Sequence, residues 1–509
     1  METDNKQIKY GAIISYSSIG INVVVALLYI PWMAEKIGQS NYGLYVLATS
    51  FINVFLIDFG LSSAVSCFLA RYRAIGDSKA ANQFFTIITK LYLFIDLFIA
   101  LVLLGIYFFI GFLYKGLTPE ELNTFKGLYC IVGSFSVLFF PFVPVTGILT
   151  AYEKFIQMKL CDLGQKLLTV LLIVFALWNR YGVFAIVTAN AVGSLFFVVV
   201  KIIIVKKSTP IRILSLHTTF DREKIKGILS FSIWTAIINL AQRYIFNIAP
   251  SILGIVSDSK EIALFSPANI LEGYFYTFAA AVNGLFLAKV SRYVALKEEN
   301  QIFSLMLKVG RYQMTVMGLI FIGFICVGHE FMVLWMGVEY EKAWLCSILL
   351  FIPDFLLFTE QIANTAIIVK NEVKRQAIGS IIMAVISITL SLMLCGKLGA
   401  IGSCIAIMCA YFFIYVYMNI VYKKYLGIDI RKFFKDCYIS FILPYSIAVI
   451  AGWSICNKVY LSSGWFHLLI KAVMVCVIYS VVVWCFALKR EEREKIKERF
   501  ENGIKRIFS

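Results

Sequence analysis

The chain alternates between long apolar runs and short polar segments over nearly its whole length. An α-helix needs about 20 mostly apolar residues to cross the hydrocarbon core of a bilayer, and most of the runs reach that length. We therefore predict an all-α polytopic membrane protein with about 14 transmembrane helices. The predicted spans are 11–32, 44–69, 84–113, 127–150, 160–178, 182–205, 227–250, 262–288, 309–327, 344–369, 377–394, 398–422, 437–456 and 466–486.

The longest hydrophilic connection divides twelve of these spans into two sets of six. Ser15 and Asn22 of the first span recur as Ser232 and Asn239 of the seventh, 217 residues later, which indicates a weak internal repeat. Six helices per half in the same order predict two bundles related by a pseudo-twofold axis along the membrane normal. The predicted parts are a first six-helix bundle at 1–205, a cytoplasmic linker at 206–226, a second six-helix bundle at 227–422, two additional transmembrane helices at 423–488 and a basic amphipathic cytoplasmic tail at 489–509.

Composition and charge agree with this class. Hydrophobic residues make up 60% of the chain and the mean hydropathy is +0.84. The net charge of +17 does not indicate a nucleic-acid partner, because 35 of the 47 Lys and Arg residues fall in the predicted inner segments and 8 in the outer loops. This bias follows the positive-inside rule and predicts that both termini and the linker are cytoplasmic.

The cysteines and histidines indicate no metal site and no disulfide framework. The 12 Cys residues lie almost entirely within apolar runs and contain no CxxC pair, and the 3 His residues are far apart in sequence. Cysteines in such surroundings behave as small hydrophobic residues.

The stretch 37–77 contains an intramembrane carboxylate, Asp58, in the middle of an apolar run. Ser62 and Ser66 follow at helical spacing and share its face, while Arg71 and Arg73 close the span on the cytoplasmic side. A carboxylate at this depth is costly unless it faces a bundle interior or a wet cavity, so we assign Asp58 a coupling or gating role.

The seventh and eighth predicted spans carry a cation and an acid at similar depth. Arg243 has Asn239 and Asn247 four residues before and after it, a polar stripe that predicts a substrate-binding surface. Glu272 lies in the eighth span and is assigned to coupling or gating. The alternative is that Arg243 and Glu272 form a fixed buried salt bridge.

Three further ionisable residues are candidates. Lys166 is assigned to substrate binding, although it lies near enough to the cytoplasmic end to be a snorkelling anchor. Asp354 follows Pro353, which can kink the tenth span, and Glu360 forms an i, i+4 pair with Asn364. We assign both acids to coupling or gating. The alternative is a kink whose buried carboxylates are paired or protonated locally.

The sequence YGLYVLATSFINVFLIDFGLSSAVSCFLARYRAIGD, residues 42–77, resembles the N-terminal signature of the Wzx-like O-antigen and exopolysaccharide repeat-unit flippases. These form the polysaccharide transporter branch of the multidrug/oligosaccharidyl-lipid/polysaccharide flippase superfamily, and the resemblance spans most of the chain. It implies a flippase, not an enzyme, that moves undecaprenyl-diphosphate-linked oligosaccharide from the inner to the outer leaflet of the bacterial cytoplasmic membrane by alternating access. It further implies coupling to a proton or sodium gradient or to the membrane potential without a bound cofactor. The implied partners are membrane lipids, the polysaccharide polymerase and the chain-length machinery.

Two other functions compete with this one. A cation-coupled multidrug or small-molecule antiporter of the related extrusion family would have twelve spans and a narrower pocket. A membrane glycan enzyme, such as a polymerase or ligase, usually carries a large outer loop with catalytic clusters, whereas the predicted outer loops here are short.

Overall fold

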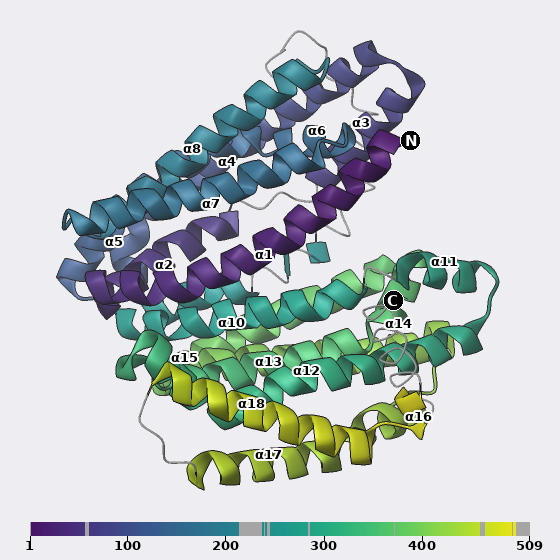
Figure 1. Ribbon diagram of the computed structural model, residues 1–509. Coiled ribbons are helices and arrows are strands. Elements are labelled where there is room, and N and C mark those ends of the chain that lie inside the picture. The colour runs from purple at the N-terminus through teal and green to yellow at the C-terminus, as the bar shows by residue number, and fades with distance from the viewer. Residues whose placement is uncertain are drawn as a thin grey trace, which may run out of the picture. The chain divides into compact units, whose positions relative to one another are not determined.

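The computed structural model describes residues 2–55, 61–212, 237, 238, 240, 241, 245–283, 286–370, 372–458, 464–490 and 492–494. This part of the chain is almost entirely helical and contains no strand (Figure 1). Ten of its helical segments are long and apolar enough to cross a membrane. The predicted all-α polytopic fold is confirmed, while the number of 14 spans stays a prediction.

The chain divides into two compact units. The first comprises Met1–Ser266 with Gln376–Ala410, and the second comprises Pro267–Arg375 with Tyr411–Ser509. Two helices, α10 (Ser259–Asn283) and α15 (Val373–Leu426), contribute to both units. The domain limits expected from the hydrophilic linker stay a prediction.

The first unit consists mainly of the N-terminal helices. The predicted span 127–150 is interrupted there and becomes α5, η1 and α6. This interruption contains Pro141 and Pro144, which cannot donate backbone hydrogen bonds to a continuous helix. The predicted span 44–69 contains α2 and α3, and residues 56–60 between them lie outside the described residues. The elements are α1 (Glu2–Ile37), α2 (Gln39–Phe55), α3 (Leu61–Ile75), α4 (Ser78–Leu113), α5 (Pro119–Phe139), η1 (Phe140–Phe142), α6 (Val145–Ala151), α7 (Phe155–Trp178) and α8 (Val183–Ser208).

The second unit contains the remaining helices and two π-helical turns, η4 and η5. Its elements are α11 (Leu287–Ala295), α12 (Glu299–Met336), η3 (Val338–Tyr340), α13 (Ala343–Thr359), α14 (Gln361–Val369), α16 (Ile430–Phe433), η4 (Phe434–Ile439), α17 (Ser440–Lys458), α18 (Trp465–Val482) and η5 (Val483–Ala487).

The start of α5 illustrates how local sequence fixes a helix boundary. The side-chain oxygen of Thr118 accepts a hydrogen bond from the backbone N–H of Glu121 at 3.3 Å, and the Glu121 carboxylate accepts one from the Thr118 N–H at 3.0 Å. Pro119 occupies the first turn, where its missing N–H has no intrahelical partner to lose. This capping box satisfies two backbone donors and starts the helix at this residue.

Small residues allow α7 and α8 to approach closely. A Cβ atom on Gly164 would lie 2.6 Å from the Phe197 ring, and one on Gly193 would lie 2.4 Å from the Thr169 hydroxyl. Lipid removes most of the hydrophobic drive for helix association, so close packing at small residues becomes a main source of stability. A larger residue at either glycine would force the Phe197 ring or the Thr169 side chain, or the helices themselves, to move.

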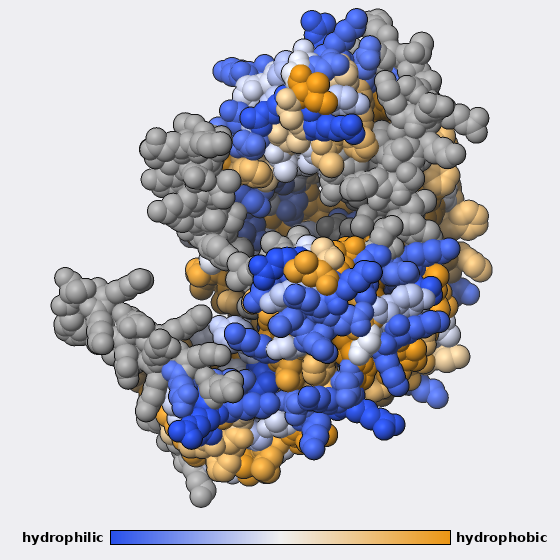
Figure 2. Space-filling view, turned by 90° about the vertical axis from the view of Figure 1, so that its right-hand side faces the viewer, coloured by the Kyte–Doolittle hydropathy of each residue, from blue (hydrophilic) through white to orange (hydrophobic). Residues whose placement is uncertain are grey.

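The surface has the distribution expected in a bilayer. Exposed large apolar residues follow one another along single helices, for example Phe94, Leu97, Phe98, Leu101 and Leu104 on α4. Figure 2 looks onto the end of the second unit at which α11 and α16 lie, where hydrophilic residues gather while apolar residues show along its sides. An apolar girdle with a polar end is typical of a helical bundle that spans a membrane.

Candidate functional site

Two buried carboxylates, Glu272 and Asp354, lie on neighbouring helices of the second unit. Glu272 on α10 is 6% exposed and Asp354 on α13 is 3% exposed. Phe275 stacks on Phe351 with ring centroids 4.5 Å apart, which holds α10 against α13 beside the two acids. The two carboxylates are close enough to interact electrostatically, and Oδ2 of Asp354 accepts no hydrogen bond from a described residue. The structure therefore brings together two of the predicted coupling residues.

The tenth predicted span is interrupted at Glu360. Helix α13 runs through Pro353 and ends at Thr359, and α14 begins at Gln361. Glu360 itself has φ −103° and ψ 7°, outside helical geometry. The break therefore falls at Glu360. This is about two helical turns beyond Pro353, which the sequence indicated as the hinge.

Polar side chains surround this break. Glu360 is 3% exposed, and one of its carboxylate oxygens accepts a hydrogen bond from Asn419 Nδ2 at 2.9 Å. The other oxygen has no hydrogen-bond partner among the described residues, and neither has the side-chain oxygen of Asn419 or of Asn364. We call Glu360, Asn364 and Asn419 the helix-break cluster. It contains three side-chain oxygen atoms that accept no hydrogen bond from a described residue.

A π-helical turn packs against the same break. Tyr438 lies in η4, and its hydroxyl forms a hydrogen bond with that of Thr359, the last residue of α13. The Tyr438 ring lies edge-on to Tyr415, with centroids 6.4 Å apart. Such π-turns are rare in helices and occur frequently at functional sites.

The three buried acids have no cationic partner in the described part of the second unit. The ion pairs found there use other carboxylates, including Glu299 with Lys370 and Glu330 with Lys471. An unpaired carboxylate buried at membrane depth is very costly in its charged form. Glu272, Asp354 and Glu360 are therefore chemically suited to bind a proton or a small cation.

The other predicted site residues are less well defined. Lys166 on α7 is half-buried and forms no described ion pair, whereas its neighbour Asp162 pairs with Lys201 of α8 at 2.8 Å. Asn247 is half-buried in the helical segment 245–256. Three predicted residues lie outside the described residues, namely Asp58, Asn239 and Arg243. The alternative pairing of Arg243 with Glu272 accordingly stays open.

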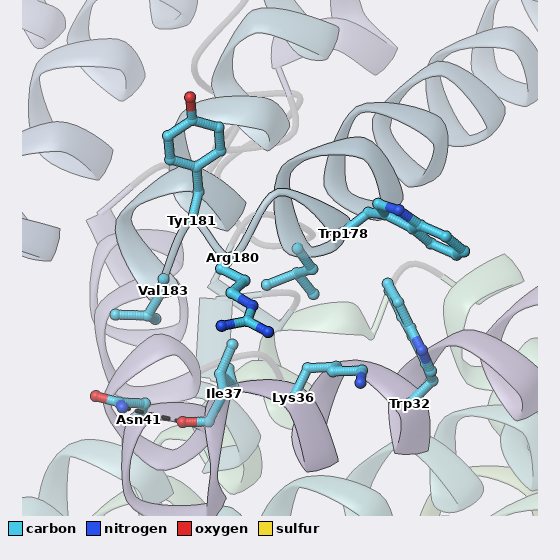
Figure 3. Close-up of a pocket in the computed structure, with 10 residues that line it drawn as sticks. Trp32, Lys36, Ile37, Asn41, Trp178, Arg180, Tyr181 and Val183 are labelled. Atoms are coloured by element: carbon cyan, nitrogen blue, oxygen red, sulfur yellow. Dashed lines mark hydrogen bonds between the residues drawn. The ribbon is translucent and has the colours of Figure 1, made fainter.

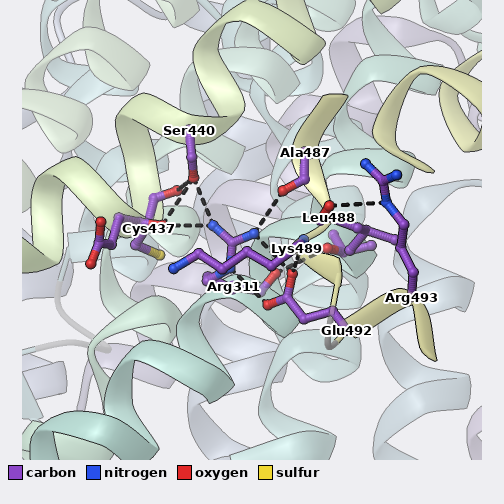
Figure 4. Close-up of polar contacts among 10 residues, drawn as sticks. Arg311, Cys437, Ser440, Ala487, Leu488, Lys489, Glu492 and Arg493 are labelled. Carbon is purple, nitrogen blue, oxygen red and sulfur yellow. Dashed lines mark hydrogen bonds and ion pairs between the residues drawn. The ribbon is translucent and has the colours of Figure 1, made fainter. Parts of the chain in front are cut away.

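Arg311 is a buried cation whose role the sequence did not reveal. It is 3% exposed on α12, and its guanidinium donates to both carboxylate oxygens of Glu492, at 2.7 and 2.9 Å (Figure 4). It also donates to the Ser440 hydroxyl and to the backbone carbonyls of Asp436 and Ala487. All five donors are thus satisfied, and Arg311 ties α12 to η4, α17 and the segment after η5.

The environment of Glu492 is consistent with a charged pair. Burial by itself would raise the pKa of this carboxyl, but hydrogen bonds from Arg311 and from the backbone N–H of Lys489 lower it below its ordinary value. In sequence, Arg311 lies just after the polar segment that follows the eighth span and counts among the inner positive charges. Its pairing with Glu492, 181 residues later in the chain, distinguishes Arg311 from those other positive charges, and the sequence pattern does not show this contact.

Comparison with known proteins identifies the family. The family described as "Polysaccharide biosynthesis protein" matches residues 8–282, which is more than half of the chain. The chain belongs to this family. The match includes Glu272 but ends before Asp354 and Glu360. No curated protein matches the chain by sequence.

Solved structures show the fold of this family member. The lipid II flippase MurJ in an inward closed conformation has a TM-score of 0.68 at 14% identity, over 96% of this chain and 99% of that one. An inward-facing multidrug resistance MATE family transporter of the MOP superfamily has a TM-score of 0.65 at 15% identity, over 79% and 98%. A MOP superfamily transporter from Pyrococcus furiosus reaches 0.57 at 14% identity, over 83% and 95%. The protein is therefore a multi-pass membrane protein with the fold of the MOP superfamily of transporters.

Proposed function

We propose that this protein is a flippase for undecaprenyl-diphosphate-linked oligosaccharide repeat units. It would carry them from the inner to the outer leaflet of a bacterial cytoplasmic membrane by alternating access, for the synthesis of O-antigen, capsule or exopolysaccharide. The observation that supports this most strongly is the family match over residues 8–282 on a fold shared with transporters. Both termini would be cytoplasmic, and the polysaccharide polymerase and chain-length machinery would take up the product.

In this proposal the buried acids of the second unit couple transport to an ion gradient. Reversing a two-state equilibrium from 1:99 to 99:1 needs about 5.5 kcal/mol. One charge that crosses a potential of 100 mV supplies roughly 2.3 kcal/mol. At that potential more than one bound cation is needed, and the chain offers two separate places, the pair Glu272 and Asp354 and the helix-break cluster. A proton or a sodium ion at each place would supply about 4.6 kcal/mol at that potential, which is most of the free energy required.

Substrate binding is assigned to the first unit. Arg243 would hold the diphosphate, because a guanidinium offers phosphate a bidentate fork of donors. Asn239 and Asn247 would bind sugar hydroxyls, Lys166 would contribute a second positive charge, and Asp58 would act in gating. Their side chains supply the hydrogen-bonding groups that a phosphorylated glycan requires.

A cation-coupled antiporter of small molecules is the second candidate. Buried carboxylates without a cationic partner among the described residues, together with the likeness to a MATE family transporter, favour it. Uptake of a fluorescent organic cation by vesicles, abolished in Asp58→Asn, would support the antiporter. Movement of a lipid-linked glycan without cation uptake would support the flippase.

The role of Arg243 is tested by a double-mutant experiment. Arg243→Ala should abolish glycan export in cells, and the double variant Arg243→Ala/Glu272→Ala should remain inactive. If Arg243 only neutralises Glu272, and Glu272 has no coupling role of its own, the double variant leaves no unpaired buried charge and regains activity. Export is compared at matched protein levels, and full recovery would contradict substrate binding by Arg243.

The coupling role is tested on the acids themselves. Glu272→Gln, Asp354→Asn and Glu360→Gln keep shape and remove charge, so each should slow transport about tenfold or more at normal protein levels. Glu298→Gln is the matched control, because Glu298 is exposed and its side chain caps no helix. Loss of protein from the membrane, instead of loss of transport, would show that the acids are structural.

A further inference from the structure

The first unit contains a cavity of about 620 Å³, and none of its described lining residues is one that we assign to transport. It lies where α1 passes into α2 and α7 passes into α8. The distribution of basic residues predicts that this end of the unit faces the outer leaflet.

Two cations face this cavity without an acidic partner. Lys36 from α1 and Arg180 from the α7–α8 turn both line it, and neither forms an ion pair with a described residue. Glu35, next to Lys36 in sequence, does not line it. Figure 3 shows the Arg180 guanidinium directed into the space above α1, on the side from which Lys36 extends.

The backbone holds Arg180 in an unusual conformation. Its φ is +61°, a region that residues other than glycine rarely adopt, and Gly182, two residues later, also lines the cavity. Helix α8 begins just after Gly182 with no side-chain cap on its first N–H groups. These N–H groups add positive potential beside Lys36 and Arg180. Together the N–H groups and the two cations favour the binding of a phosphate group.

Aromatic rings complete the cavity on the side open to lipid. Trp32 and Trp178 both line it, and Figure 3 shows their indoles on the same side of the Arg180 guanidinium, one extending from each of two helices. Trp178 is 81% exposed, and Leu171 and Phe175, which precede it at helical spacing on α7, are exposed as well. Tryptophan prefers the membrane interface, and an exposed apolar strip below it suits acyl chains.

We propose that this cavity binds the headgroup of an anionic glycerophospholipid in the outer leaflet. Lys36 and Arg180 would hold the phosphate, the indoles would pack against the glycerol region, and the acyl chains would run along the apolar strip of α7. A lipid fits better than a free phosphate because the strip continues the cavity into the region where a bilayer would lie. This inference does not depend on the transported substrate.

The test uses the full-length protein in bilayers of phosphatidylcholine that contain a small, equal fraction of brominated phosphatidylglycerol or brominated phosphatidylcholine. Bromine quenches tryptophan fluorescence on contact. The chain has 8 Trp residues, so Trp32→Phe/Trp178→Phe identifies the part of the signal that belongs to the cavity. We expect brominated phosphatidylglycerol to quench this part selectively.

The charge requirement is tested with Lys36→Gln/Arg180→Gln. Each lost cation should weaken the apparent affinity for phosphatidylglycerol about tenfold, the factor that 1.4 kcal/mol represents. The matched control is Lys115→Gln/Lys260→Gln, which removes the same charge from exposed outer positions away from the cavity and should keep the selectivity. Unchanged thermal midpoints would show that both double variants are folded.

Five outcomes would overturn the proposal. Equal quenching by the two brominated lipids would mean that the tryptophans are interfacial anchors only. Selectivity that persists in Lys36→Gln/Arg180→Gln, or disappears equally in the control, would mean that the cavity does not bind the phosphate. Displacement by inorganic phosphate, or far better displacement by a polyprenyl diphosphate, would mean that the ligand is not a glycerophospholipid.

Discussion

At the scale of single residues, the burial of charge separates structural side chains from those available for function. Arg311 is buried with every donor satisfied, whereas Asp354 and Glu360 are equally buried with carboxylate oxygens that have no described partner. A satisfied buried pair rigidifies its surroundings, and an unsatisfied buried acid must bind a proton or a cation. We therefore assign Arg311 to stability and the two acids to coupling.

Glu492→Gln should destabilise the second unit. The change removes the negative charge opposite the Arg311 guanidinium, and breaking a buried ion pair costs about 3–5 kcal/mol. We expect a loss of roughly 2–3 kcal/mol, because Glu492 keeps 29% of its side chain exposed. Thermal unfolding of the purified wild type and of Glu492→Gln measures this loss of stability.

The control for this prediction is Glu494→Gln. Glu494 pairs with Arg490 on the surface, with side chains 65% and 93% exposed, and such pairs contribute little. Its effect should remain within about 0.5 kcal/mol. Equal losses in both variants would contradict the structural role of the Arg311–Glu492 pair.

The same pair predicts a pH dependence. Because the pKa of Glu492 is lowered in the folded protein, its contribution to stability is complete above the ordinary carboxyl pKa of about 4.3 and is lost as the pH falls through the lower folded value. The difference in thermal midpoint between the wild type and Glu492→Gln should thus be constant from pH 7 to pH 5 and shrink below about pH 4. A difference that already shrinks above pH 5 would contradict this assignment.

At the scale of elements, α15 contains two predicted spans, 377–394 and 398–422, and departs from helical geometry near the start of the second, at Gly399. Gly399 has φ +56° and ψ −135°, and a Cβ atom there would lie 2.2 Å from a carboxylate oxygen of Glu261. That oxygen accepts a hydrogen bond from the Ala400 N–H at 2.7 Å. A glycine is required at this position for both its backbone angle and its lack of a side chain.

Gly399→Ala should cost about 1–3 kcal/mol, the usual cost of a backbone conformation of this kind for a residue with a Cβ atom. Gly396→Ala is the control in the same segment, since a Cβ there would have its nearest neighbour at 3.9 Å and Gly396 has no positive φ. Thermal unfolding and protein level in the membrane measure both. If Gly396→Ala were as unstable as Gly399→Ala, the loss at Gly399 would not come from its positive φ or from its close approach to Glu261.

At the scale of the whole molecule, the distribution of positive charge determines the expected orientation. The predicted inner segments contain 35 Lys and Arg residues and the outer loops contain 8. An inverted protein would place the 35 residues outside the cell, against the positive-inside rule. The cavity lined by Lys36 and Arg180 belongs to the outer end on this assignment. The quenching experiment tests lipid binding at this cavity, and a separate labelling experiment tests the orientation.

Cysteine accessibility tests the orientation directly. In a background without the 12 native cysteines, Lys207→Cys and Lys505→Cys should remain unlabelled by a membrane-impermeant maleimide in intact cells and react after permeabilisation. Lys115→Cys should react in intact cells. Labelling at position 207 or 505 before permeabilisation would overturn the predicted topology.

The sequence by itself determined the class of the protein, because each apolar run long enough to span a bilayer must become a helix that satisfies its own backbone. It also indicated Asp354 and Glu360 as unusual, since a carboxylate within such a run is costly wherever it lies. Tertiary structure alone decided which groups meet. Glu492 reaches Arg311 across 181 residues, and Asn419 reaches Glu360 across 59. The break between α13 and α14 lies at Glu360 and not at Pro353. These contacts depend on how helices pack and rotate against one another, which a one-dimensional pattern of apolar and polar residues does not specify.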